Sequence, residues 1–424
     1  MRLEFGYGKG IQAVEVPDKN LLAVLRPESM EHERTGESAV QYALEHPIGS
    51  ERLGRLVRAG QRIAIITSDI SRPLPSYEVL PPVLNELYAV GISPGDITVV
   101  FALGSHRRHT EEEKRHLAGE RCYEEVNCVD SDPEDCIHLG VTKRGTPVDI
   151  TRVVAEADVR ICLGNIEFHY FAGYSGGAKA VMPGVSTPEA IQANHRMMTD
   201  RAACAGRLAD NPLRMDIEEA GDILGIDFIV NVVLDERKQI VYCAVGDHRE
   251  AHRKGCAYLD RMYRRPITEQ ADIVLVSQGG APKDTNLYQT QKALENAKYA
   301  VKKGGRIILI GACEEGMGSA VFERWLVEAS SPHDLVERIG RKFELGGHKA
   351  AAVGMVLERA DIDLVSELPD SLVKSIFLNP QPSAQDAFDQ ALRQYGKDAK
   401  VIAMPYGGAT LPVPAEQTEK NGEG

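Results

Sequence analysis

The sequence has no long apolar run. No stretch of about 18 apolar residues, the length of a membrane span, occurs in it. The first residues, MRLEFGYGKGIQAVEVP, lack the apolar segment of a signal peptide. The eight cysteines include no C-x-x-C pair, and Cys122, Cys128 and Cys136 are followed by no His/Cys group at zinc spacing. We therefore expect a cytoplasmic protein with reduced thiols and no membrane partner.

Positive charge is also scarce. The chain carries 49 lysine and arginine residues against 62 acidic residues, which gives a net charge of −13. This excess repels nucleic acids and anionic membranes, so neither is expected as a partner. An anionic small molecule would have to be bound by a few local cations.

Nucleotide-binding motifs are incomplete. In HYFAGYSGGAKAVMPG (169–184), a P-loop beginning at Gly173 would need a second glycine and a hydroxyl where Ala178 and Ala180 stand. No G-x-G-x-x-G follows a predicted strand, which counts against a nicotinamide-dependent dehydrogenase. The glycines still allow a ligand to approach the backbone closely. The structural alternative is a tight strand-to-helix connection with a solvated Lys179.

Short apolar runs alternate with helical stretches along the whole chain. Near-continuous runs ending in Gly, Asp, Ser or His are typical of buried parallel strands. They occupy residues 62–69, 96–106, 158–165, 228–235, 272–280 and 305–312. The pattern predicts an α/β fold with two domains, 1–268 and 269–424, each with a mostly parallel sheet flanked by helices. The active site is expected in the cleft between them.

Two further local predictions concern the C-terminal half. A helix is expected over residues 284–303, with Gly304 and Gly305 as its stop. Residues 414–424, PAEQTEKNGEG, read as a frayed tail.

Polar side chains follow two of the predicted strands. Asp69 and Arg72 lie in TSDISRPLPS, and His106 and His109 lie in GSHRRHT. Arginine offers a planar fork for a carboxylate, and histidine carries protons near neutral pH. An Asp–Arg pair that braces its loop, and capping or surface histidines, are the structural alternatives.

Two predicted helices carry further candidates. Ser186 with Glu189 fits a capping box and Pro188 a first turn, which puts His195 on the second or third turn. In NLYQTQKAL (286–294), Tyr288 and Lys292 lie four residues apart and so share a helix face. A structural helical histidine and an ordinary amphipathic helix are the alternatives.

The order of these motifs resembles the catalytic subunit of the nickel-pincer lactate racemase family. Over residues 67–292 the chain reads S-D-x-x-R-P, G-x-H-R, H-x-x-x-G-Y-S-G-G-x-K-x-x-x-P-G, N-H and Y-Q-x-x-K. The resemblance implies a racemase or epimerase of a 2-hydroxy acid, lactate or a related acid. It also implies a cofactor, nickel bound by pyridinium-3,5-bisthiocarboxylate mononucleotide, which cofactor-biosynthesis proteins would load.

The resemblance implies roles for the residues near the cofactor. Lys179 would carry the nucleotide through a thioamide, and His195 would be the protein's ligand to nickel. Gly176 and Gly177 would let the nucleotide lie against the backbone. Asp69 would contact its ribose or orient the neighbouring arginine.

The resemblance implies roles in the chemistry as well. His106 and His169 would be alternate acid/bases, each exchanging the hydroxyl proton of one enantiomer, while the α-hydrogen moves reversibly as hydride to the cofactor. The groups that would bind the substrate anion are Arg72, Lys292, Gln289 and Tyr288.

One part of the pattern is missing. The resemblance implies an aromatic pocket residue from the second domain, which the sequence does not identify, because Trp325 reads as part of an ordinary helix. GGHKAAA (346–352) is a candidate pocket loop, in which His348 or Lys349 would suit a more polar substrate. Two other functions stay open, a nicotinamide-dependent 2-hydroxyacid dehydrogenase and a hydroxy-acid-binding protein that does not load the cofactor.

Overall fold

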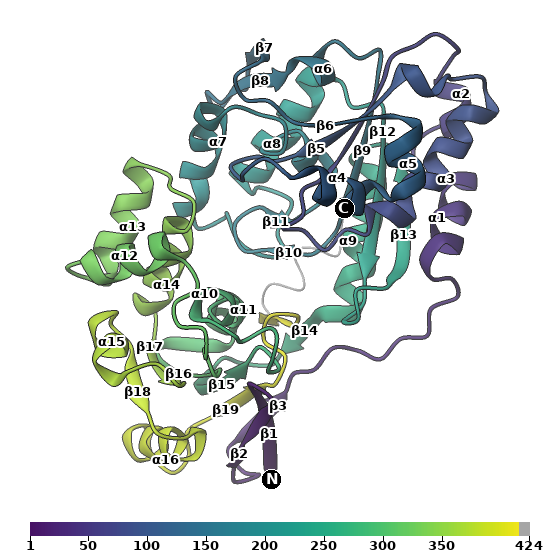
Figure 1. Cartoon of the computed structure of the whole chain (residues 1–424). Helices are drawn as coiled ribbons and strands as arrows, with labels where there is room; N and C mark the ends of the chain where they lie inside the picture. Colours follow the sequence, from purple (N-terminus) through teal and green to yellow (C-terminus); the bar gives the residue numbers. More distant parts are fainter. Residues whose placement is uncertain (415–424) are drawn as a thin grey trace. The chain divides into compact units, whose positions relative to one another are not determined.

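The computed structural model describes residues 1–414, which form two compact units (Figure 1). One unit combines Met1–Ser29 with the residues from Met262 onward, and the other is Met30–Arg261. The predicted division at 268/269 placed the first 29 residues with the N-terminal domain. Here they belong with the C-terminal part, because strand β3 (Leu21–Val24) pairs with β19 (Val401–Met404). Most of the expected tail, residues 415–424, lies outside the described part, and Pro414 ends strand β20.

The Met30–Arg261 unit is built on a six-stranded sheet. In sheet order the strands are β13 (Ile240–Gly246), β12 (Phe228–Leu234), β9 (Val159–Asn165), β4 (Ile63–Ser68), β5 (Ile97–Ala102) and β6 (Asn127–Asp130). All are parallel except β13, which runs antiparallel to β12. The four apolar runs predicted in this region are the four central strands. Their carboxyl ends therefore meet at one sheet edge, where open α/β sheets bind ligands.

Helices cover this sheet. One buried cluster joins Val40 and Leu44 of α1 and Leu80 and Leu84 of α3 to the strands. Each buried aliphatic side chain of this kind contributes about 1.5–3 kcal/mol. The helices are α1 (Gly36–Glu45), α2 (Leu53–Leu56), α3 (Ser76–Ala89), α4 (Glu111–Ala118), α5 (Glu120–Glu125), α6 (Arg152–Ala155), α7 (Pro188–His195), α8 (Pro212–Leu224) and α9 (Glu250–Tyr263). Two ribbons complete the unit, β7 (Cys136–Val141) with β8 (Pro147–Thr151) and β10 (Phe168–His169) with β11 (Gly173–Tyr174).

The second unit has an all-parallel six-stranded sheet. In sheet order its strands are β18 (Asn379–Gln381), β17 (Asp361–Val365), β16 (Val301–Ile310), β15 (Ala271–Ser277), β19 and β3. The predicted runs 272–280 and 305–312 are β15 and β16, so the α/β fold with two largely parallel sheets is confirmed. Outside the sheet, β1 (Arg2–Tyr7) pairs with β2 (Gly10–Glu15) and β14 (Arg264–Ile267) with β20 (Leu411–Pro414).

The helix expected over 284–303 is shorter than predicted and is divided in two. It begins at Leu287, is interrupted at Gln291 and ends at Ala300, and Val301 already pairs with Ala271 of β15. Strand pairing overrides the helical pattern of residues 301–303. The helices are α10 (Leu287–Thr290), α11 (Lys292–Ala300), α12 (Ala320–Glu328), α13 (Pro332–Arg341), α14 (Gly347–Leu357), α15 (Asp370–Ser375) and α16 (Ala384–Tyr395). Trp325 lies in α12 with 1% of its surface exposed, so its expected place in a helix is confirmed.

Two predictions about composition can be compared with the structure. All eight cysteines are free thiols. Within residues 1–414, no helix is long and apolar enough to cross a membrane.

Candidate active site

His106 and Asp69 meet at the carboxyl edge of the Met30–Arg261 sheet. Asp69 follows β4 and His106 follows β5, and these strands pair in parallel. The Nδ1 atom of His106 lies 2.6 Å from Oδ2 of Asp69, which is 4% exposed. Burial alone would raise the pKa of Asp69, but the hydrogen bond and charge of His106, with Ser71 and Arg72, lower it overall. The ionised carboxylate therefore accepts the Nδ1 proton and leaves the lone pair of His106 on Nε2.

Asp69 also pairs with Arg72, the partner expected from the sequence. The Nε atom of Arg72 lies 4.0 Å from Oδ1 of Asp69, and the arginine side chain is 53% exposed. Contact with His106 was missed because 37 residues separate the two. Their positions at the ends of adjacent strands were the available signal.

His109 is buried, against the expectation of a surface or capping residue. Its Nδ1 atom lies 2.6 Å from Oδ1 of Asp130, and its Nε2 atom accepts the N–H of Ile70 at 3.1 Å. Because Nε2 is an acceptor, the neutral ring donates from Nδ1 to Asp130. His109 thus braces the loop that holds Asp69.

His169 ends the short strand β10, which pairs with β11. Its Nδ1 atom accepts the N–H of Ala172 at 3.3 Å, so the neutral ring carries its proton on Nε2. Burial, then the positive charges of Lys179 and Arg72, hold the pKa of His169 well below its ordinary value. His169 therefore stays neutral at physiological pH and has the opposite tautomer to His106.

The glycine–lysine segment turns tightly after β11. Lys179 lies in a 3-10 turn, Gly177–Ala180, and is partly covered. Enclosure by protein, then the charges of Arg72 and Arg214, hold the pKa of its amine well below the ordinary value. A neutral amine is nucleophilic. The Gly104 N–H donates to the Gly184 carbonyl at 2.9 Å, which joins this segment to the loop of His106.

The backbone conformation and the close approach of a neighbouring side chain explain why residues 176 and 177 are glycines. Gly176 has φ +75° and Gly177 φ +59°. A Cβ on Gly176 would lie 2.6 Å from Oδ1 of Asn231, the same oxygen that accepts the Gly177 N–H at 2.7 Å. Asn231, which the sequence did not single out, fixes this turn from β12.

His195 is the last residue of α7 and is 6% exposed. The helix begins as expected with Pro188, but Thr187 caps it by accepting the Ala190 N–H, so the predicted Ser186–Glu189 capping box is wrong. Ser186 instead donates to the Val181 carbonyl.

A chain of buried hydrogen bonds orients the His195 ring. The amide of Asn194 donates to Asp216 at 2.7 Å, which turns its Oδ1 atom toward Nδ1 of His195 at 3.1 Å. His195 donates through Nδ1 and keeps the lone pair on Nε2, the form that binds a metal. Asp216, buried and also bonded to Thr142 and Thr146, was not predicted from the sequence.

Phe171 brings three of the predicted residues together. Its ring centroid lies 4.5 Å from that of His169 and 5.0 Å from that of His195, and the Lys179 ammonium nitrogen lies 5.8 Å from it. The sequence placed these residues in one motif but gave no role to the phenylalanine between them.

The remaining candidates lie in the other unit and are described within it. Tyr288 and Gln289 are in α10, and Lys292 opens α11. The Nζ atom of Lys349 donates to the Tyr288 carbonyl at 3.0 Å and lies 3.8 Å from its ring centroid. Lys349 is 9% exposed and lies on α14, so residues 347–352, expected as a pocket loop, form the start of a helix.

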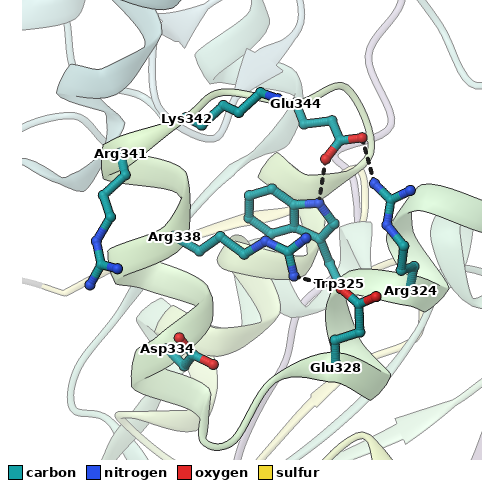
Figure 2. A pocket seen from close by; sticks show the side chains of 8 residues that line it. All are labelled: Arg324, Trp325, Glu328, Asp334, Arg338, Arg341, Lys342 and Glu344. Atoms are coloured by element: carbon teal, nitrogen blue, oxygen red, sulfur yellow. Dashed lines mark hydrogen bonds and ion pairs between the residues drawn. The ribbon is translucent and has the colours of Figure 1, made fainter.

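Two cavities are lined by residues of different units. One of about 550 Å³ lies between α12 and α13 and contains no predicted site residue. Figure 2 shows that several of its charges are paired within the cavity: Arg338 with Glu328 at 3.1 Å, and Arg324 with Glu344 at 2.6 Å. A smaller cavity of about 240 Å³ opens beside His106. Among residues 1–414, no group of three His, Cys, Asp or Glu side chains could hold a metal ion. A metal at His195 would need most of its ligands from a bound group.

The fold and these side chains define an α/β protein with histidines and a lysine gathered at the carboxyl side of a parallel sheet. Sequence-family comparison agrees with the motif order. The lactate racemase N-terminal domain matches residues 7–206, and the lactate racemase C-terminal domain matches residues 267–411.

Individual relatives match over almost the full length. The lactate racemase of Thermoanaerobacterium thermosaccharolyticum is 33% identical over 421 residues, covering 96% of this chain and 98% of the relative. The lactate racemase of Lactiplantibacillus plantarum is 31% identical over 417 residues, with the same coverage of 96% and 98%.

Solved structures extend the comparison. The lactate racemase apoprotein from T. thermosaccharolyticum superposes with a TM-score of 0.88 at 31% identity, covering 97% of this chain and 100% of that chain. A Thermotoga maritima protein, with a TM-score of 0.64 at 17% identity, shares the fold, covering 91% of this chain and 100% of that chain. The chain belongs to the lactate racemase family of 2-hydroxyacid racemases and is an isomerase.

Proposed function

We propose that the protein racemises or epimerises a 2-hydroxy acid, lactate or a close relative, with a nickel-pincer nucleotide attached to Lys179. The observation that carries the proposal is the gathering of Lys179, His169 and His195 around Phe171, beside the Asp69–His106 pair.

The residues fit such a cofactor. Burial lowers the pKa of Lys179, which increases the neutral fraction of its amine that can be acylated. His195 would offer Nε2 to nickel, and the nucleotide would supply the remaining donors. The group would supply a hydride acceptor, which removes the need to form a carbanion next to a carboxylate.

Proton transfer falls to the two histidines. The lone pair on Nε2 of His106, held by Asp69, is ready to take the hydroxyl proton of one enantiomer. His169, its pKa lowered, is neutral and serves the other enantiomer. Nε2 of His169 carries the ring proton in this arrangement, so it can accept the hydroxyl proton only after the ring proton moves to Nδ1. That change of tautomer requires the 3.3 Å hydrogen bond from the Ala172 N–H to Nδ1 to open.

Substrate binding must overcome the negative charge of the protein. We assign the substrate carboxylate to Arg72 and Lys292, with Gln289 and Tyr288 as polar partners. The Arg72 side chain is half-exposed, so its guanidinium group is accessible to a ligand. An arginine fork can bind a carboxylate through two hydrogen bonds.

The test uses protein co-produced with the cofactor-making enzymes. Chiral chromatography of a panel of 2-hydroxy acids should show interconversion of at least one pair of enantiomers without added nicotinamide nucleotide. Mass spectrometry should find a sulfur-containing adduct on the Lys179 peptide. Lys179→Ala should lose the adduct, the nickel and the activity, while exposed Lys342→Ala should keep all three.

Three outcomes would overturn the proposal. Full activity of Lys179→Ala would exclude a tether at this position. Turnover only with free nicotinamide nucleotide would favour a dehydrogenase, and binding of both enantiomers without interconversion by loaded protein would favour a binding protein.

A further inference from the structure

Phe171 contacts three residues of the proposed machinery, His169, His195 and Lys179. It is 3% exposed, and its ring meets the rings of His169 and His195 edge-to-face at interplanar angles of 73° and 69°. Tyr170 packs on it in the same way at 4.5 Å. Edge-to-face pairs have a preferred geometry because the ring face is negative and the ring edge positive.

The backbone around Phe171 is held by the start of α8. The Asn211 side chain donates to the Phe171 carbonyl at 2.9 Å. Arg214, fully buried, donates to the carbonyls of Ala172, at 3.1 Å, and Tyr174. These hydrogen bonds fix the backbone that carries the ring. The ring itself lies next to His169, His195 and Lys179.

Lys179 is in contact with the same ring. Its nitrogen lies 5.8 Å from the ring centroid, within the range of a cation–π contact for the protonated amine. Acylation of the amine removes the charge, and the ring then offers an apolar surface to the uncharged side chain. The same contact suits both the unmodified and the modified lysine.

We infer that Phe171 is a positioning residue that fixes the separation of the proton carrier His169, the metal ligand His195 and the tether Lys179. This inference rests on the proposed function. Phe171 touches neither substrate nor metal by this argument, and it acts through the orientation of the two histidine rings. Loss of the ring leaves space beside both histidines, so their preferred orientations are lost.

Three variants test the inference in loaded protein. Phe171→Leu removes the ring and keeps an apolar side chain, whereas Phe171→Tyr keeps the ring. Phe228→Leu, at a fully buried phenylalanine of β12 in the core cluster with α1 and α3, is the matched control for lost stability. Each is assayed for thermal unfolding, the Lys179 adduct, nickel content, the absorption spectrum of the nickel site, kcat and KM.

Phe171→Leu should keep the Lys179 adduct but shift the nickel absorption and lower nickel retention or kcat roughly 10- to 100-fold, the effect of losing a partner that orients a metal ligand. KM should change much less than kcat. Phe171→Tyr should restore most of the loss, and Phe228→Leu should lower the unfolding temperature without changing the nickel spectrum or kcat.

The inference is overturned if Phe171→Leu has the nickel spectrum and kcat of the wild type, or if Phe228→Leu reproduces its losses. If Phe171→Leu does not fold, Phe171→Met, which fills similar space without a ring, takes its place under the same criteria. Failure of the proposed function is a separate result, because wild-type protein would then carry no adduct and no nickel.

Discussion

The two proposed proton carriers lie in opposite electrostatic surroundings. His106 is 25% exposed and bonded to a carboxylate whose pKa is lowered. Burial, together with the positive charges of Lys179 and Arg72, lowers the pKa of His169 itself. A racemase meets two mirror-image hydroxyl groups, yet the protein is chiral and offers each a different environment. Two histidines can therefore serve one reaction without being equivalent.

Removing either histidine gives the largest expected effect. His106→Gln and His169→Gln should each slow interconversion by roughly 10²- to 10⁴-fold, the usual contribution of a positioned acid/base. In a single turnover, each variant should form keto acid from one enantiomer only, and from opposite ones. Chiral analysis after rapid quenching measures this, with exposed His333→Gln as the control. Equal losses for both enantiomers in both variants would show that the histidines do not divide the work.

Removing the carboxylate should have a smaller effect. Asp69→Asn no longer fixes the tautomer of His106 and should lower kcat roughly 10- to 100-fold, with the larger loss for the enantiomer served by His106. Glu358→Gln removes a comparable partner, at 2.6 Å from the exposed His333, and should leave kcat unchanged. An Asp69→Asn enzyme as fast as wild type would remove Asp69 from the mechanism.

The effect of Asp69→Asn on stability should depend on pH. Because the folded-state pKa of Asp69 is lowered, its stabilising contribution is present above the unfolded pKa of about 3.9 and is lost as the pH falls through the folded value. The unfolding temperature of Asp69→Asn should be below that of wild type at neutral pH, and the gap should narrow below about pH 4. A gap that does not change with pH would show that ionisation of Asp69 does not stabilise the fold.

The lowered pKa of Lys179 can be tested by acylation of its amine. In protein made without the cofactor pathway, limited acetylation near neutral pH should modify Lys179 faster than the exposed Lys342, because each unit of lowered pKa raises the neutral fraction about tenfold. Arg72→Met should reduce this preference, since it removes a charge that lowers the pKa. Peptide mass spectrometry gives both rates, and equal rates would contradict a lowered pKa of Lys179.

The smallest catalytic effect is expected at His109. His109→Leu removes the side-chain partner of Asp130 Oδ1 and of the Ile70 N–H and should cost about 1–3 kcal/mol of stability. Chemical denaturation measures this cost. The rate should fall less than in Asp69→Asn, because His109 supports the loop and does not touch His106. A larger rate loss than in Asp69→Asn would give His109 a direct role.

The predicted strands show which parts of the fold a local sequence pattern can predict. The six apolar runs became central strands because a strand buried on both faces needs a continuous apolar sequence, which is visible without the fold. The helix end at Ala300 and the cap at Thr187 were missed, since pairing with β15 and the packing of Ser186 decided them.

The sequence by itself determined which residue types were present and in what order: Lys179 among its glycines, His195 on a helix, and His106 after a strand. Only the tertiary structure decided their partners. Asp69 joined His106, Asn194 and Asp216 oriented His195, Phe171 came to lie between His169, His195 and Lys179, and β3 joined the other unit's sheet. Most of these contacts join residues far apart in sequence, and packing and burial of whole elements selected them, which no local periodicity encodes.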